Sequence, residues 1–337
     1  MNVKRTMVQV VKVELSIMVN KEESVTEINS EQVSRRSFVG RTAAGLGALA
    51  FGAGEVFGQS SQREQSGREG RFFNRVVLIT GATSGIGEGT AYAFARQGAK
   101  VFFCGRREDL GQQVEARIKN SGGDATYFKA DVRREEDVRN FIAAGIRKYG
   151  RLDIAFNNAG IATNVNAPVA EQPSADFLDI MNTNAAGVFY SMKYEVPHML
   201  NNEPWGAYGT RGVIINNASV SGHVGFGGIS PYSASKHAII GLTRCASIEY
   251  GGRGIRVNSI SPGGVNTPMR NRAYLAQGFT EDKIPTVPNF QRRINTVDEM
   301  ADVVMFLAEN AASSIFGTDL DVTGGMLTGA HFTQART

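Results

Sequence analysis

The sequence predicts an α/β fold with a single doubly wound, Rossmann-type parallel sheet of about seven strands and helices on both faces. Three observations predict it. Short β-branched or apolar runs alternate with helical stretches from about residue 72 onward, the first run leads directly into a glycine-rich turn, and polar residues follow several of the runs. Such alternation is typical of parallel strands joined by right-handed crossovers.

The expected elements follow one another without an internal repeat. We expect strands near 75–80, 100–104, 125–130, 153–157, 212–217, 255–261 and 319–322. We expect helices near 85–97, 109–120, 135–149, 174–199, 232–250 and 297–309, and a loop over 264–294. Residues 72–337 are therefore expected to form one domain, which is long enough for an extensive core.

The first strand runs into a turn that suits a phosphate ligand. Arg75 to Thr80 reads as a buried strand, and Gly81-Ala82-Thr83-Ser84-Gly85-Ile86-Gly87 follows it at the start of a helix. Glycines permit positive φ and a close approach of the backbone to a ligand. The N–H groups of a helix N-terminus can hold a pyrophosphate.

A phenol and an ammonium lie one helical turn apart in Tyr232-Ser233-Ala234-Ser235-Lys236. On one helix face, the Lys236 cation favours ionisation of the Tyr232 hydroxyl, which brings it toward the range where proton exchange with an alcohol or carbonyl is efficient. Ser219 follows the apolar run 212–217, at the strand end where open α/β sheets place ligand groups. Asn157-Asn158-Ala159-Gly160 supplies polar side chains at another strand end.

Together these motifs make the chain resemble the short-chain dehydrogenase/reductase family, in the branch with a Thr-Gly-three residues-Gly-any-Gly turn. The resemblance runs from about Phe72 to the C-terminus. Its elements occur in the expected order: Thr80 to Gly87, Asp131, Asn157 to Gly160, Asn184, Ser219, Tyr232 with Lys236, and Pro262-Gly263.

The resemblance implies a role for each matching residue. Tyr232 is expected to be the catalytic acid/base, Lys236 to lower its pKa and bind the nicotinamide ribose, and Ser219 to hold the substrate oxygen. Asn184 is expected to hold a water in the proton path, with Asn182 as the alternative. The expected cofactor-binding residues are Gly81, Ser84, Gly85, Ile86, Gly87, Arg106, Asp131, Val132, Asn158, Ala159, Gly160, Tyr232, Lys236, Pro262, Gly263, Val265 and Thr267.

The end of the second strand bears on the choice of cofactor. An acidic side chain there would bond the ribose 2′-hydroxyl of NAD, but Gly105 occupies the position and Arg106 follows it. A guanidinium suits a 2′-phosphate, so we expect NADP. NAD stays possible if Arg106 and Arg107 are solvated turn residues and Glu108 or Asp109 serves the ribose.

Composition argues against several classes of function. The net charge of +4 is mild and its basic residues are interspersed with acids, so no nucleic-acid partner is expected. Four histidines and two cysteines show no metal-ligand spacing, so no metal is expected. Cys104 and Cys245 are expected to be buried small apolar residues rather than a disulfide pair.

The resemblance implies a homo-oligomer, commonly a tetramer formed through helices 174–199 and 232–250.

The N-terminal part has a different character. Residues 1–58 contain Ser34-Arg35-Arg36-Ser37-Phe38 followed by a weakly apolar run, which is the layout of a twin-arginine export signal. That run is too short for a stable membrane anchor. Residues 59–71 read as a disordered linker. We expect a periplasmic protein, and the alternative is a cytoplasmic enzyme with an uncleaved tail.

The resemblance implies hydride transfer between NADP(H) and a small alcohol or carbonyl substrate that the sequence does not identify. Two alternatives stay open at this point. One is a reductase of 3-oxoacyl thioesters, and the other is a nucleotide-binding scaffold or sensor without turnover.

Overall fold

The computed structural model describes residues 70–163, 165–276, 279–280, 283 and 289–328. The expected leader, 1–58, and residues 59–69 of the expected linker lie outside the described residues. Arg71, at the end of that linker, lies within them. Its guanidinium donates to the Glu309 carboxylate at 2.5 Å and its backbone N–H donates to Gln97 Oε1 at 3.2 Å.

The described chain contains a parallel seven-stranded sheet in the order β3-β2-β1-β4-β5-β6-β7. The strands are β1 Val76–Thr80, β2 Lys100–Gly105, β3 Asp124–Lys129, β4 Ile154–Asn157, β5 Gly212–Asn217, β6 Ile255–Pro262 and β7 Asp319–Val322. The order reverses direction between β1 and β4, which makes this the point where a doubly wound sheet opens a crevice at its carboxyl edge. The predicted fold class is confirmed.

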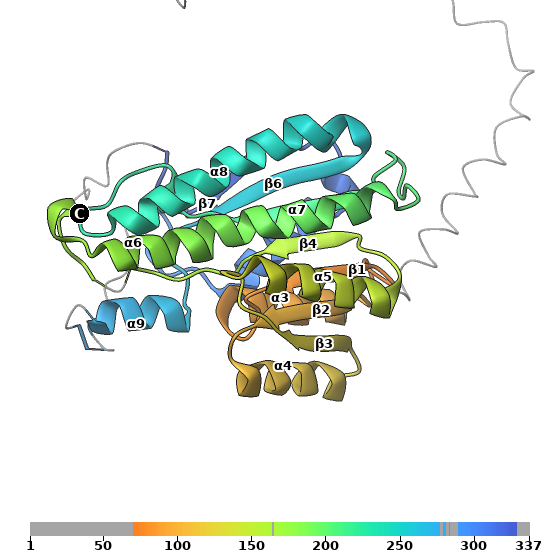
Figure 1. The fold of residues 1–337 in the computed structure, drawn as a ribbon, viewed down its shortest axis with the longest axis horizontal. Coiled ribbons are helices and arrows are strands. Elements are labelled where there is room, and N and C mark those ends of the chain that lie inside the picture. The colour runs from red at the N-terminus through yellow and green to blue at the C-terminus, as the bar shows by residue number, and fades with distance from the viewer. Residues whose placement is uncertain (1–69, 164, 277–278, 281–282, 284–288, 329–337) are drawn as a thin grey trace, which may run out of the picture. The chain divides into compact units, whose positions relative to one another are not determined.

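Helices cover both faces of the sheet (Figure 1). They are α3 Gly85–Arg96, α4 Glu108–Asn120, α5 Glu135–Tyr149, α6 Ser174–Ile180, α7 Gly187–Leu200, α8 Ser230–Tyr250, α9 Pro268–Ala276 and α10 Val297–Ala308. One apolar core joins the sheet to α3, α4 and α10 and includes Phe94 and Val304, both fully buried. The other joins it to α5, α7 and α8 and includes Phe141 and Ile239. Burial on both faces explains why the strands read as continuous apolar runs.

The expected loop 264–294 was wrong in one part, because it contains α9. The segment has no clear apolar period, and Pro268 reads as a helix breaker in the sequence. At the first helical position, however, proline is well tolerated, since its missing N–H has no partner there in any helix. The Thr267 hydroxyl accepts a hydrogen bond from Arg270 N at 3.3 Å and so caps the first turn.

The expected helix over 174–199 is interrupted. Residues Met181–Ala186 form a π-helical turn between α6 and α7. Such a turn contains one extra residue per hydrogen-bonded ring, and it is found frequently at functional sites. Here it contains Asn184, which is fully buried.

Cys104 is buried in β2 as expected, but Cys245 on α8 is exposed, so the expectation for Cys245 was wrong. Cys245 shares its helix face with Ile248, whose exposed fraction is 85%.

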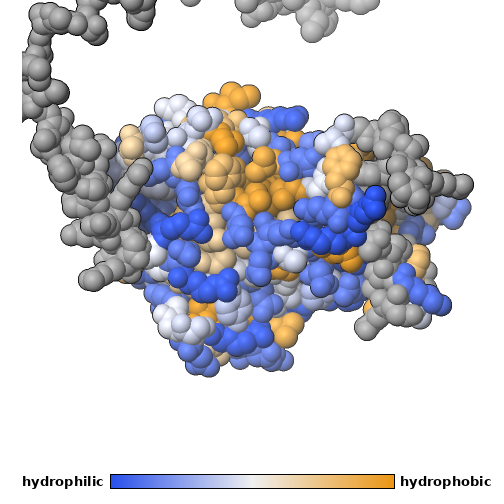
Figure 2. All heavy atoms as spheres, turned by 180° about the vertical axis from the view of Figure 1, so that it is seen from behind, coloured by the Kyte–Doolittle hydropathy of each residue, from blue (hydrophilic) through white to orange (hydrophobic). Residues whose placement is uncertain are grey.

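An assembly through α7 and α8 stays a prediction. The opposite face of the molecule, seen in Figure 2, is mainly hydrophilic with apolar residues gathered in one area. Within the described residues, no helix combines the length and hydropathy that a membrane span requires.

Candidate active site

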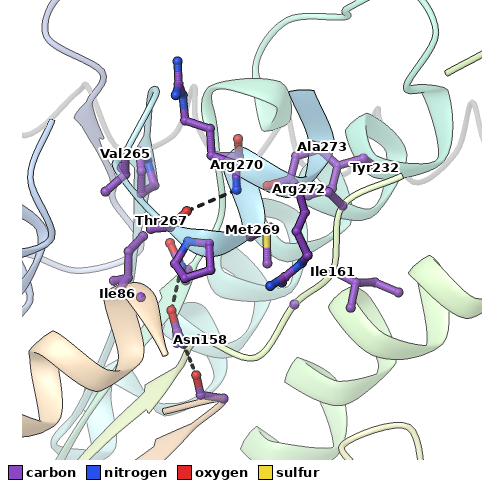
Figure 3. Close-up of a pocket in the computed structure, with 18 of the residues that line it drawn as sticks. Ile86, Asn158, Ile161, Tyr232, Val265, Thr267, Met269, Arg270, Arg272 and Ala273 are labelled. Atoms are coloured by element: carbon purple, nitrogen blue, oxygen red, sulfur yellow. Dashed lines mark hydrogen bonds between the residues drawn. The ribbon is translucent and has the colours of Figure 1, made fainter. Parts of the chain in front are cut away.

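A cleft of about 1260 Å³ opens at the carboxyl edge of the sheet. It is lined by the loops after β1, β2, β4, β5 and β6 together with α9. Figure 3 shows Ile86, Val265 and Thr267 along one side of the cleft and Tyr232 on the other, with Arg272 extending from α9 between them. The cleft therefore lies where the reversal of strand order predicts a ligand site.

The glycine turn adopts the conformation that its sequence predicts. Gly81 and Gly85 have φ of +69° and +62°, which is the left-handed region that favours glycine. A Cβ on Gly81 would lie 2.6 Å from Ala159 Cα, so a side chain there would separate β1 from the loop after β4. The turn leads directly into α3, and its backbone can approach a pyrophosphate at the helix N-terminus. These residues fit a dinucleotide cofactor.

Asn158 connects the ends of three strands. Its Nδ2 donates to Thr80 O and Gly81 O, both at 3.1 Å, and its Oδ1 accepts from Asn217 Nδ2 at 2.9 Å. The Thr80 hydroxyl accepts from the backbone N–H groups of Asn158 and Ala159 at 3.1 Å each. These bonds hold the floor of the cleft in one arrangement.

Ser219, Tyr232 and Lys236 lie together in the cleft, and all three line it. Lys236 Nζ lies 5.5 Å from the centre of the Tyr232 ring and donates to Asn217 O at 2.7 Å. Ser219 Oγ accepts from Ser221 N at 3.2 Å at the end of β5. The structure therefore places the three residues predicted as catalytic in one cleft.

The pKa values in this group are governed by burial. Burial raises the pKa of the Tyr232 phenol, and its hydrogen bond with Ser219 opposes that rise. Burial also lowers the pKa of Lys236 to about 7. The sequence predicts that the Lys236 cation lowers the pKa of Tyr232. In the structure, burial is the largest influence on that pKa, and it raises it.

The π-helical turn determines which asparagine is buried beside the cleft. Asn184 Oδ1 accepts from Ile161 N at 2.8 Å, and its Nδ2 donates to Ile161 O at 3.0 Å and Ser235 Oγ at 3.0 Å. Asn182, the alternative, is exposed. The position of a Cβ on Gly160 would be 3.2 Å from Asn184 Oδ1 and 3.7 Å from Lys236 Nζ, so the two side chains flank the same glycine.

Two arginines follow β2 and behave differently. Arg106 is 4.0 Å from the Asp131 carboxylate. Arg107 donates to Thr83 Oγ1 at 2.8 Å and Ser84 Oγ at 2.6 Å, so it joins β2 to the glycine turn. Burial, followed by the nearby Arg272 and Arg106 cations, lowers the pKa of Arg107. Like charges therefore gather around this end of the cleft.

Most of the predicted site residues line the cleft, but three do not: Gly87, Asp131 and Asn184. Gly87 is packed against Asn158, where a Cβ would lie 2.5 Å from Nδ2. Burial raises the pKa of Asp131, but hydrogen bonds from Arg133 outweigh it and hold that pKa below its usual range. Asp131 is therefore an anion that is already paired.

Sequence reasoning missed several residues that line the cleft. Arg107 was considered only as a solvated turn residue, although it lies two residues after the end of β2 and next to Arg106. The other missed residues include the apolar Ile161, Val165 and Met326, which no local pattern connects to the site.

Comparisons with known proteins agree with this geometry. A family model described as enoyl-(acyl carrier protein) reductase matches residues 81–327. A 2,5-dichloro-2,5-cyclohexadiene-1,4-diol dehydrogenase of Sphingobium indicum is 37% identical over 74% of this chain and 96% of its own. A cyclohexanol dehydrogenase of an Acinetobacter species is 37% identical over 75% of this chain and 95% of its own.

Among solved structures, levodione reductase is 33% identical and superposes with a TM-score of 0.67 over 76% of this chain and 98% of its own. The glycine turn, the Ser219, Tyr232 and Lys236 group and strands β2 to β7 all lie within the matched family region, and β1 directly precedes it. The chain therefore belongs to the short-chain dehydrogenase/reductase family of nicotinamide-dependent oxidoreductases.

Proposed function

We propose that this protein transfers hydride between NADP(H) and a secondary alcohol or its ketone, with Tyr232 as the acid/base. The observation that carries the proposal is the enclosure of Ser219, Tyr232 and Lys236 in the same cleft as the glycine turn. A bound nicotinamide ring supplies the hydride acceptor or donor. The chain itself then has to bind the substrate oxygen and move one proton.

Proton transfer falls to Tyr232. In the direction of carbonyl reduction its phenol gives a proton to the substrate oxygen, and the raised pKa keeps that proton in place at neutral pH. Ser219, which bonds the phenol, is positioned to donate to the same oxygen as negative charge develops on it. Alcohol oxidation needs the phenolate instead. A protonated Lys236 stabilises that phenolate, so the two directions are expected to favour different pH.

Support for NADP comes from the charges after β2. Arg106 and Arg107 both line the cleft, whereas Glu108 and Asp109 do not, and Glu108 is paired with Lys129 at 2.9 Å. A 2′-phosphate would relieve the repulsion between neighbouring guanidiniums, while a ribose hydroxyl would not. The expected result is that Arg106→Ala lowers kcat/KM with NADP about tenfold or more and leaves kcat/KM with NAD nearly unchanged. Equal losses with both cofactors would remove this part of the proposal.

Support for an alicyclic substrate comes from the wall of the cleft and from the relatives. The wall of the cleft includes Val165, Phe226, Ile229 and Met326, which offer apolar surface to a ring. Two relatives are named for alcohols on a six-membered carbon ring, a dichlorocyclohexadienediol and cyclohexanol. We therefore propose a cyclic secondary alcohol or ketone as the substrate class. A 3-oxoacyl thioester is the competing substrate class.

The test follows nicotinamide absorbance in the purified protein. The substrates are cyclohexanol with NADP⁺, and cyclohexanone or an acetoacetyl thioester with NADPH. Tyr232→Phe is expected to lower kcat by at least about a hundredfold, while Tyr208→Phe, a change at a tyrosine that is 69% exposed, leaves it unchanged. Turnover of the thioester alone would favour the competing class. Bound nucleotide without turnover of any of these substrates would favour the scaffold.

We also propose that residues 1–58 direct export by the twin-arginine route. The proposal depends on Arg35 and Arg36 and the apolar run after them. Replacing both arginines with lysine is expected to move the full-length protein from the periplasmic to the cytoplasmic fraction of a host with that pathway. If the protein is distributed between the two fractions as before, the result would favour the alternative, a cytoplasmic enzyme with an uncleaved tail.

A further inference from the structure

Two loops form the wall of the cleft that faces the proposed substrate. The first follows β4 and contributes Val165 and Asn166, and the second lies between Gly222 and α8 and contributes Phe226 and Ile229. Val165 and Phe226 are each 40% exposed, so apolar packing alone does not fix the position of these loops. The contacts that join the two loops are hydrogen bonds.

A single side chain bonds both loops. Gln172 Nε2 lies 2.9 Å from Val165 O, 2.9 Å from Ala167 O and 2.8 Å from Gly228 O. The side-chain amide has two N–H bonds for these three carbonyl oxygens, so one of the two protons is shared between two carbonyls. One further bond joins the loops directly, from Ala167 N to Gly228 O at 3.2 Å.

The position of Gln172 is itself well defined. It follows the short 3₁₀ turn Val169–Glu171 and precedes Pro173, which restricts the backbone of Gln172 to the extended conformation that it has here. Gln172 does not line the cleft. Its effect on a substrate must therefore act through the loops that it bonds.

The two loops also fit each other closely. Gly228 has φ of +83°, and a Cβ at this position would overlap the side-chain amide of Asn166. The contact thus requires glycine both for its conformation and for space. Without the Gln172 donor, the carbonyl oxygens of Val165, Ala167 and Gly228 would lose this hydrogen-bond partner, and the bond from Ala167 N to Gly228 O would remain between the loops.

We propose that Gln172 is a positioning residue that joins the two loops and so sets the size of the ring that the substrate wall accepts. This inference rests on the proposed function. It separates the role of Gln172 from that of the apolar residues that touch the substrate.

The kinetic test uses Gln172→Glu and Gln172→Met. The glutamate has the same length but no donor when ionised, and the methionine has a similar length with neither donor nor charge. Each is expected to raise KM for cyclohexanol about tenfold, to leave KM for NADP within twofold, and to shift kcat/KM toward a bulkier bicyclic alcohol. Gln113→Met, at an exposed position on α4, is the matched control and is expected to change none of these values.

A second readout does not depend on activity. Hydrogen exchange in Gln172→Met is expected to speed up together in residues 161–171 and 223–229, with no change in the glycine turn. If the wild type turns over no alcohol or ketone, the proposed function fails, and this measurement still decides the role of Gln172. Unchanged exchange in either loop would overturn the inference. An equal rise in KM for alcohol and for NADP would overturn it as well.

Discussion

The most specific stability prediction concerns Glu195 on α7, which is 1% exposed. Its Oε2 accepts from Asn157 Nδ2 at 3.1 Å. Burial raises the pKa of Glu195 from 4.5 to about 8, and only the Asn157 bond opposes it. We therefore expect a neutral carboxylic acid at pH 7. Asn157 Oδ1 is a buried acceptor without a hydrogen-bond partner among the described residues.

The substitution Glu195→Gln keeps the size and the acceptor but cannot ionise. In the wild type, the folded protein holds a proton between pH 4.5 and about 8 that the unfolded chain has lost. The stability contributed by this proton is fully present below pH 4.5 and is lost as pH rises through 8. From pH 5 to pH 8 the wild type should lose on the order of 3 kcal/mol relative to the glutamine variant, at 1.36 kcal/mol per pKa unit.

The assay is urea unfolding of both proteins at one protein concentration, at pH 5, 6, 7 and 8. Other titrating groups are common to both proteins and cancel in the difference. Glu249→Gln, at an exposed position on α8, measures the effect of removing a carboxylate from the surface. A difference between wild type and Glu195→Gln that is the same at every pH would refute the reasoning. The infrared band of a protonated carboxylic acid should also disappear in the variant.

Three further substitutions test other parts of the fold. Arg256→Met removes a buried guanidinium that bonds three carbonyls after and within the last turn of α10, and urea unfolding should show a loss of about 3 kcal/mol. Thr296→Ala breaks the capping box with Glu299 at the start of α10 and should cost about 1 kcal/mol in the same assay. Gly87→Ala places a Cβ 2.6 Å from Gly81 O, so nucleotide titration should show affinity at least about tenfold weaker than in the wild type.

The strands were predictable because each is a local apolar run that ends in a turn signal, and every expected strand lies within two residues of an observed one at each end. The interruption at Met181–Ala186 was not predictable in this way. A π-helical turn leaves no local periodicity signal, and its effect is to direct Asn184 inward while Asn182 stays exposed. The choice between these two residues therefore needed the structure.

The chemistry-bearing residues of the site were predictable because their types and spacing are restricted by the reaction. The wall was not. The loops that contain Val165 and Phe226 are joined by bonds from one amide to the backbone carbonyls of Val165 and Gly228, and a carbonyl is present at every residue whatever its side chain. Gln172 therefore carried no motif that a reading of side-chain types could detect.

The consecutive asparagines at the ends of β4 and β5 show how one strand end serves two purposes. Successive side chains on a strand point to opposite faces. Asn157 and Asn216 bond each other at 3.0 Å on the side of α7, where Asn216 also donates to Thr243 at 2.9 Å. Asn158 and Asn217 bond each other at 2.9 Å on the side of the cleft. The cleft floor is thus attached to a second polar layer behind it, and a charge on Glu195 would disturb that layer first. Because the two layers share the same strand ends, ionisation of a residue outside the cleft is expected to loosen the asparagines that shape it.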